Sequence, residues 1–262
     1  MRVFALLMVL AMSVSTFAAS PVLTVAQKKY SAAELLSRPD VTSFTVADDV
    51  SYHRSMTYKV VPLRALLPVA PADRYDTLEA RATDGFVAQI PLDLISRGGA
   101  IPYLAIEDPA HPWAALPTEN KSAGPFYVVW DHPRKSDIRS EQWPFALASL
   151  TFAESPVHRW PQLASPSSDP QAQAGQKVFV SYCLPCHQMK GAGVGKVGPD
   201  LGQPMPVLHY ITEPGLRAIV RNPAGVRSWP EQHMAGFDTK ALPEQDLDAL
   251  VAYLKGMKGM AK

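Results

Sequence analysis

The chemically most informative part of the sequence is a run of five residues, Cys183-Leu184-Pro185-Cys186-His187. It contains the only two cysteines of the chain, three positions apart, and a histidine follows the second directly. Two thiols at this spacing can each add to one vinyl group of a haem, and the next residue then places an imidazole beneath the iron. The sequence therefore predicts one covalently bound c-type haem, with His187 as an axial ligand of its iron.

Two other kinds of site use paired cysteines. A dithiol redox pair usually opens a helix that follows a strand, whereas here a helical pattern precedes Cys183. A structural zinc site needs a fourth ligand and usually a second cysteine pair, and the sequence contains no further cysteine. Because both thiols stand in one motif, no disulfide framework joins distant parts of the chain. Covalent haem is therefore the favoured interpretation.

The sequence from Asp169 to the C-terminus resembles the class I cytochromes c. Gly175 and Phe179 stand on the expected first helix, where that family packs it against the last helix. Tyr253 is the matching aromatic residue on the expected last helix, in which apolar residues recur at helical spacing. The resemblance implies an all-α cytochrome c fold for residues 170–262, with helices expected from Asp169 to the cysteines, over 213–220 and from Pro243.

The string Gly198-Pro199-Asp200-Leu201 carries the second part of this resemblance. It is similar to the family's loop in which a proline carbonyl accepts a hydrogen bond from the axial histidine. The resemblance implies that Pro199 fixes the ring of His187 in this way.

The sixth iron ligand is selected among four methionines that follow the motif: Met205, Met234, Met257 and Met260. Met234 lies between the expected middle and last helices, where the family brings its distal methionine, although the usual Met-Pro-x-Phe string is Met-Ala-Gly-Phe here. Met205 is close to the proline loop, and the other two lie at the C-terminal end, where we expect fraying. Met234 is the preferred ligand. The alternatives are that it only packs, with His233 or His209 as the ligand or with an open position.

A His/Met ligand pair would raise the reduction potential relative to two histidines and would leave the iron coordinatively full, which suits electron transfer. Trp229 is expected either to hydrogen-bond a haem propionate or to line the pocket. Arg217, Arg221 and Arg227 could neutralise propionates, but a solvated helix face is the favoured interpretation.

The chain divides near a Pro- and Ser-rich stretch, residues 156–169, which has the composition of a linker. The preceding residues 20–155 alternate short apolar runs with turn signals and predict a β-rich α+β domain. Asp84-Gly85 predicts a hairpin, and Ser31 with Glu34 predicts a capping box. The expected strands are 22–25, 41–46, 78–83, 86–90, 104–106, 126–130 and 147–152, and short helices are expected from Pro62 and Pro91.

Four short strings in the N-terminal domain occur in the order found in the molybdopterin-binding domain of the sulfite-oxidase family, which residues 40–130 resemble. They are residues 61–67, residues 83–86 with 90–92, residues 103–106 and residues 124–129. That family binds molybdenum through a cysteine thiolate upstream of the first string. The corresponding residues 44–55 contain no cysteine, which argues against a standard molybdenum centre and a bound molybdopterin.

Several polar residues of this domain could mark an inherited pocket. His53, Arg54, Arg64 and Lys121 could hold an anion, and His53 with Met56 could suit copper. Polar residues in surface turns are the favoured interpretation. The tryptophans are expected to pack in the core or linker and not to form a docking patch: Trp113, Trp130 and Trp143.

The first nineteen residues have the features of a signal peptide. Arg2 gives a positive start, residues 3–14 are almost wholly apolar, and residues 15–20 are rich in small side chains, with cleavage sites after Ala18 and Ala19. A retained membrane anchor is the alternative, but the apolar run is shorter than the roughly 20 residues that a span needs. We expect an exported, periplasmic protein with no transmembrane segment after cleavage.

Charge and composition narrow the function. With 25 basic and 24 acidic residues, the chain offers no electrostatic basis for binding nucleic acid. No catalytic residues can be assigned, which favours an electron-transfer protein over an enzyme. The N-terminal domain would then dock a redox partner, a dehydrogenase or an oxidase. The alternatives are a haem-containing, sulfite-dehydrogenase-like oxidoreductase with catalysis in the N-terminal domain, and a binding or sensing module.

Overall fold

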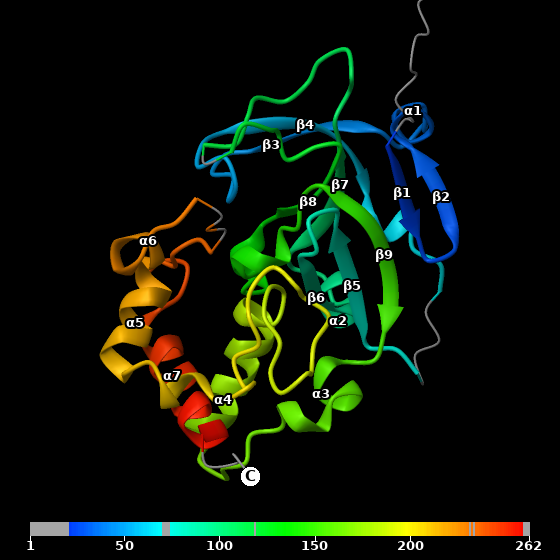
Figure 1. Ribbon diagram of the computed structural model, residues 1–262. Coiled ribbons are helices and arrows are strands. Elements are labelled where there is room, and N and C mark those ends of the chain that lie inside the picture. The colour runs from blue at the N-terminus through cyan, green and yellow to red at the C-terminus, as the bar shows by residue number, and fades with distance from the viewer. Residues whose placement is uncertain (1–20, 70–73, 118, 231, 233, 259–262) are drawn as a thin grey trace, which may run out of the picture.

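The computed structural model describes residues 21–69, 74–117, 119–230, 232 and 234–258. The expected signal peptide, His233 and Met260 lie outside these residues. A β-rich N-terminal part is followed by a helical C-terminal part, whose helices gather on one side of the sheets (Figure 1). Among the described residues, no helix combines the length and the apolar character that crossing a membrane would require.

The N-terminal domain contains two β-sheets. The five-stranded sheet has the order β2-β1-β9-β5-β6, and the four-stranded sheet has the order β3-β4-β7-β8. The pair β1 and β9 is parallel, and all other recorded strand pairs are antiparallel. The strands are β1 (Val22–Val25), β2 (Lys28–Ser31), β3 (Thr42–Val46), β4 (Met56–Pro62), β5 (Thr77–Ala82), β6 (Val87–Pro91), β7 (Ile101–Ile106), β8 (Phe126–Asp131) and β9 (Leu147–Ala153).

Local sequence signals account for much of this domain. Ser31 caps α1 (Ala32–Leu36), and its predicted capping box with Glu34 is present. At the hairpin between β5 and β6, the side chain of Asp84 accepts a hydrogen bond from the backbone N–H of Phe86 at 2.9 Å. Gly85 has a φ of +97° there, which glycine adopts without steric cost. The predicted β-rich α+β class is confirmed, and every predicted strand is present.

Two strands and one helix differ from expectation. β2 and β4 had no predicted counterpart: β2 begins with two lysines, a residue type depleted in strands, and β4 follows closely on the polar turn at residues 51–54. The helix expected from Pro62 is only a 3₁₀ turn, η1 (Leu63–Ala65), since Pro62 itself ends β4. The helix expected from Pro91 is α2 (Leu92–Ser96). Two further short turns follow in this domain, η2 (Pro133–Lys135) and η3 (Ser140–Gln142), and the linker begins with a one-turn helix, α3 (Pro156–Arg159).

The C-terminal domain is helical, as predicted. Its longest helix, α7, packs along α4, and the two form the most extensive helix contact of the molecule. Its elements are η4 (Pro161–Leu163), α4 (Pro170–Val178), the π-helical turn η5 (Phe179–Cys183), η6 (Val207–His209), α5 (Glu213–Arg221), α6 (Pro223–Val226) and α7 (Glu244–Lys258).

Two separate hydrophobic cores hold the two domains. The larger core lies in the β-rich domain and includes Trp130 and Trp143, which are buried, with Trp113 packed against it. The expectation that these tryptophans serve packing is therefore confirmed. The smaller core lies among the C-terminal helices and centres on Phe179 and Tyr253.

The linker residues are bound to both domains. Arg159 of α3 forms an ion pair with Glu79 of β5 at 2.8 Å. Leu163 is fully buried in the helical core, and its carbonyl accepts a hydrogen bond from the hydroxyl of Tyr253 at 2.9 Å. This segment therefore fixes the position of the C-terminal domain instead of acting as a loose tether.

Candidate haem-attachment site

The cysteine motif follows directly on α4 and the turn η5, and α4 begins at a capping aspartate. The side chain of Asp169 accepts a hydrogen bond from the N–H of Gln171 at 3.0 Å and caps α4. After α4, the π turn η5 leads into the motif, where the N–H of His187 donates to the carbonyl of Cys183 at 2.8 Å. The backbone thus continues from η5 as a hydrogen-bonded helical turn, in which the N–H of Cys186 also donates to the carbonyl of Cys183 at 3.1 Å. Residues three positions apart on a helix share a face, so Cys183 and Cys186 present their thiols on one side.

The ring of His187 is held in one orientation. Its Nδ1 lies 2.7 Å from the carbonyl oxygen of Pro199. Burial lowers the pKa of His187, which favours the neutral imidazole, with one proton, at neutral pH. Because a carbonyl only accepts, that proton is on Nδ1, and the lone pair of Nε2 is left free for a metal.

Gly198 forms a wall against this ring. A Cβ added at Gly198 would lie 2.6 Å from Nδ1 and 2.8 Å from Nε2 of His187, which is closer than real Cβ contacts allow. The N–H of Gly198 also donates to the carbonyl of Cys186 at 2.9 Å. The proline loop and the motif are therefore in direct contact, and only glycine leaves room for the imidazole.

Asp200 fixes the proline loop, a role that the sequence interpretation missed. Its carboxylate accepts hydrogen bonds from four backbone N–H groups, those of Lys190, Gly191, Gly202 and Gln203, at 2.6 to 3.0 Å. Pro199 is thereby held at the distance that His187 requires. The available signal was an aspartate two residues before a glycine, a pattern typical of side-chain-capped turns.

The two cysteines are free and half-buried. Burial raises the pKa of Cys186 to about 12 and raises that of Cys183 further above its ordinary range, and the carboxylate of Glu141 adds to both shifts. Reactive cysteines of dithiol oxidoreductases have a lowered pKa. The surroundings of this pair therefore do not suit a redox-active dithiol.

The N-terminal domain lies directly against the motif. β6 is an edge strand of the five-stranded sheet, and the N–H of Val87 donates to the carbonyl of Pro185 at 3.0 Å. The turn η3 also packs on η5. An N–H group at the free edge of the sheet thus forms a hydrogen bond with Pro185, the middle residue of the motif.

Glu141 of η3 lies at this junction, where its charge acts on both cysteines. It is half-buried, hydrogen-bonded to Ser140, and burial raises its pKa to about 7. In the unfolded chain its pKa returns toward 4.5. Between these two pKa values the folded protein binds more protons than the unfolded chain. The unfolding free energy is therefore highest at low pH and falls as the pH rises from 4.5 to about 7.

We expect Glu141→Gln to remove this fall. The variant should match the wild type near pH 4 and exceed its unfolding free energy near pH 8 by up to about 3 kcal/mol. Urea unfolding followed at a series of pH values measures the effect. Glu154→Gln, which changes an exposed carboxylate of the same domain, serves as the control. Equal pH profiles for the wild type and Glu141→Gln would contradict the prediction.

The candidate sixth ligands differ in their surroundings. Met234 is half-buried in the loop between α6 and α7. Met205 is 45% exposed, and His209 is exposed. Met257 does not lie at a frayed end as expected: it is 1% exposed within α7 and belongs to the helical core. Of these residues, Met234 alone combines partial burial with a position in a loop.

The arginines considered for propionate binding have other partners in the structure. Arg217 forms ion pairs with Glu213 and Asp248, as expected of a solvated helix face. Arg221 instead binds three backbone carbonyls of the loop after Met234, which was not foreseen.

The polar residues proposed for propionate or anion binding are mostly on the surface. Trp229 is 48% exposed and has the guanidinium of Arg227 over its ring at 5.6 Å; its role as a haem contact stays a prediction. In the N-terminal domain, His53, Arg54 and Arg64 are exposed, and Lys121 forms an ion pair with Glu119 at 3.3 Å.

Residues 44–55 correspond to the segment in which the sulfite-oxidase family has its cysteine. Here the side chain of Asp49 fixes the conformation of this segment through hydrogen bonds. This fully buried carboxylate accepts hydrogen bonds from the N–H groups of Ser51 and Tyr52, both at 2.9 Å, and from the hydroxyl of Tyr58 at 2.8 Å. Its acceptor sites are used within the turn, which gives Asp49 a structural role. Across the described ranges, no group of three or more His, Cys, Asp or Glu side chains is placed to hold a metal ion.

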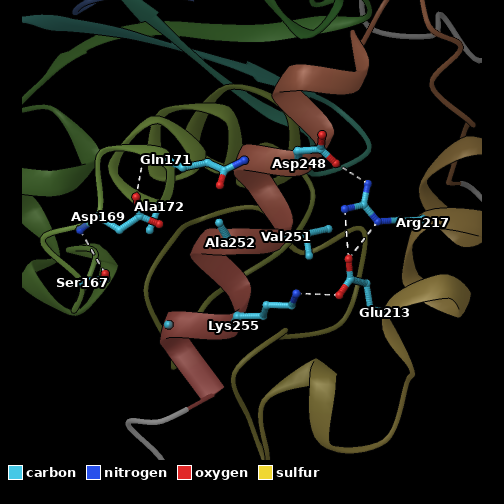
Figure 2. Close-up of a pocket in the computed structure, with 11 residues that line it drawn as sticks. Ser167, Asp169, Gln171, Ala172, Glu213, Arg217, Asp248, Val251, Ala252 and Lys255 are labelled. Atoms are coloured by element: carbon cyan, nitrogen blue, oxygen red, sulfur yellow. Dashed lines mark hydrogen bonds and ion pairs between the residues drawn. The ribbon is translucent and has the colours of Figure 1, made fainter.

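A surface hollow of about 550 Å³ lies away from the motif, between the start of α4, α5 and α7. Figure 2 shows that its charged side chains point toward one another: Glu213 bridges Arg217 and Lys255, and Arg217 also reaches Asp248. These four charges are paired with one another, Asp169 of the same hollow caps α4, and the hollow contains no residue of the motif.

Comparison with known proteins agrees with the helical part of this description. Residues 172–258 match the family model for cytochrome c. No curated protein and no solved structure matches the chain. The family match does not extend to the β-rich domain, so the resemblance of residues 40–130 to the sulfite-oxidase family stays a prediction. Residues 172–258 are a cytochrome c domain, which implies bound haem c and supports a haem-based electron carrier.

Proposed function

We propose that this protein is a periplasmic c-type cytochrome that carries single electrons. Cys183 and Cys186 bind one haem through thioether bonds, and His187 and Met234 are the axial ligands of its iron. The N-terminal domain docks a redox partner, a dehydrogenase or an oxidase, beside the haem. The observation that carries the proposal is the imidazole of His187, fixed by Pro199 with Nε2 free, within a domain that matches cytochrome c.

The residues present fit a covalent haem. The motif supplies two protonated thiols on one helical face and a neutral imidazole next to them. Because Gly198 has no side chain, it leaves room for the imidazole of His187, whereas a Cβ at this position would clash with the ring. One imidazole nitrogen and one methionine sulfur for the iron, with two thiols for covalent attachment, are the groups that a His/Met c-type haem requires.

The chain's own residues contribute three things to electron transfer. The hydrogen bond to Pro199 keeps His187 in one tautomer and one orientation in both oxidation states. The thioether of Met234 would supply a softer ligand than a second imidazole, which favours the reduced iron and raises the potential. Asp200 holds the proline loop in place, and Arg221 holds the loop after Met234, so little rearrangement accompanies a change of charge. The haem, when bound, supplies the reversible one-electron couple of its iron.

The docking role of the N-terminal domain rests on its contacts with the motif. Val87 binds the carbonyl of Pro185, and η3 packs on η5. A partner that binds the outer surface of this domain is therefore held at a fixed distance from the haem. If this domain instead carried catalysis, it would need its own metal or organic cofactor.

Metal content and optical spectra of protein matured in a periplasm test the proposal. We expect one iron per chain, no stoichiometric molybdenum or copper, and the weak far-red band that sulfur ligation gives to oxidised haem. Met234→Leu should abolish this band, whereas the exposed Met205→Leu should retain it. Cys183→Ala with Cys186→Ala should yield protein without covalent haem.

Two outcomes would overturn parts of this proposal. Stoichiometric molybdenum or copper would favour an enzyme with catalysis in the N-terminal domain. A strong spectral response of the reduced protein to carbon monoxide would show an open iron position and favour a sensing module. Export is tested by sequencing the N-terminus of the mature protein, which should begin at Ser20 or Ala19.

A further inference from the structure

The loop after Met234 is fastened to the helices at several points. The N–H of Phe237 donates to the carbonyl of Val220 at 2.9 Å. The guanidinium of Arg221 donates to the carbonyls of Phe237, Asp238 and Leu242 at 2.7 to 3.1 Å. Gly236 lies against the backbone of Arg221, where a Cβ would clash with the carbonyl. The loop that carries Met234 is therefore held by its backbone just downstream of the methionine.

Tyr182 connects this loop to the haem motif. It directly precedes Cys183, its hydroxyl donates to the carbonyl of Ala241 at 2.7 Å, and its ring meets that of Phe237 edge-on with centroids 5.5 Å apart. One side chain thus links the helix that carries the cysteines to the loop that carries Met234.

Arg139, a residue of the N-terminal domain, completes the connection. Its Nη1 donates to the hydroxyl oxygen of Tyr182 at 3.2 Å and pairs with Asp246 of α7 at 3.1 Å. Its Nη2 pairs with Asp137 at 2.7 Å, and its backbone N–H donates to the side chain of Gln142 at 2.8 Å. The guanidinium is 27% exposed, so it is shielded from much of the solvent.

The direction of these hydrogen bonds matters. A guanidinium only donates, so the oxygen of Tyr182 accepts from Arg139, and its own hydrogen is directed to the carbonyl of Ala241. Donation by a charged group polarises the hydroxyl and strengthens the second bond of the chain. The contact from the N-terminal domain therefore tightens the attachment of the loop.

We propose that Arg139 is a positioning residue through which the N-terminal domain, acting on Tyr182, holds the loop of Met234 and keeps the methionine on the iron. The proposal rests on the proposed ligation by Met234. It makes the N-terminal domain part of the control of the sixth iron position, in addition to its docking role. Loss of Arg139 releases the loop, weakens sulfur ligation and opens the position to added ligands.

The test uses oxidised, haem-loaded, full-length protein with Arg139→Gln, Arg139→Lys and Tyr182→Phe. Imidazole is the probe, because it competes with the methionine for the iron. We expect imidazole to bind about tenfold more tightly to Arg139→Gln, as the loss of one charge-assisted hydrogen bond implies. The far-red sulfur band should weaken and the midpoint potential should fall. Arg139→Lys, which keeps the charge, should restore part of the effect.

Tyr182→Phe keeps the ring contact with Phe237 but removes the hydroxyl. Because both residues act through one chain of hydrogen bonds, the double variant should show no more than the larger single effect. Amide hydrogen exchange should speed up over residues 237–242 in each variant. Lys240→Gln is the matched control: it breaks the interdomain ion pair with Asp48, 3.0 Å long and with side chains 84% and 74% exposed, on the same loop. It should leave all readouts unchanged.

The outcomes separate this proposal from the proposed ligation. A wild type without the sulfur band would overturn the ligation by Met234 and, with it, the role of Arg139. A wild-type band that persists in Arg139→Gln, with unchanged imidazole affinity and potential, would overturn the role of Arg139 alone. In that case a lower thermal stability of Arg139→Gln would show that the residue only joins the two domains.

Discussion

Gly198→Ala is expected to displace the imidazole of His187 and thereby to disturb the haem site. The added Cβ would lie 2.6 Å from Nδ1 and 2.8 Å from Nε2 of the ring. Either the ring or the loop must move, and both movements break the 2.7 Å hydrogen bond to Pro199. We expect loss of fixed histidine ligation, a lower midpoint potential and a loss of about 2 to 3 kcal/mol in unfolding free energy.

Optical spectra, redox titration and denaturant unfolding of the haem-loaded protein measure this effect. Gly215→Ala is the control, because it adds a methyl group in the first turn of α5 with its nearest contact, the side chain of Thr212, at 3.2 Å. It should retain the wild-type spectrum and potential. A Gly198→Ala variant with the wild-type potential would show that the ring of His187 does not need the space beside Gly198.

Much of the fold could be predicted because its signals are local. The hairpin at Asp84-Gly85 and the capping box at Ser31 depend on a few adjacent residues, and both are present. β2 and β4 could not be predicted in the same way. Their residues form strands because β1, β3 and β7 pair with them, and pairing within a sheet can override a weak local preference.

The same distinction applies to the site. The cysteine motif and the proline loop are short strings, and the structure brings His187 and Pro199 together as the resemblance implied. The contacts of Val87 with Pro185 and of Arg139 with Tyr182 join residues 98 and 43 positions apart. Neither an arginine on a turn nor the amide of an edge strand forms a recognisable sequence motif. The contacts of the N-terminal domain with the site could therefore be found only in the structure.

The crossing of α4 and α7 determines the stability of the cytochrome domain, and Gly175→Ala is expected to disrupt it. A Cβ at Gly175 would meet the backbone carbonyl of Ala249 and would lie 2.8 Å from the Cβ of Tyr253. Backbone atoms cannot rotate away as a flexible side chain can, so the helices must separate. The rings of Phe179 and Tyr253, with centroids 5.4 Å apart, would then lose their contact.

We expect a loss of about 3 kcal/mol in unfolding free energy, even though alanine is the better helix former by about 1 kcal/mol. Gly256→Ala is the control on the partner helix, since its nearest contact is the ring of Pro166 at 3.3 Å; it should be neutral or slightly stabilising. Denaturant unfolding of both variants measures the difference. If Gly175→Ala were as stable as Gly256→Ala, the gain in helix propensity would exceed the cost of the clash between α4 and α7. The position of the cysteine motif would then depend on the contacts that Val87 and Arg139 of the N-terminal domain make with Pro185 and Tyr182 instead.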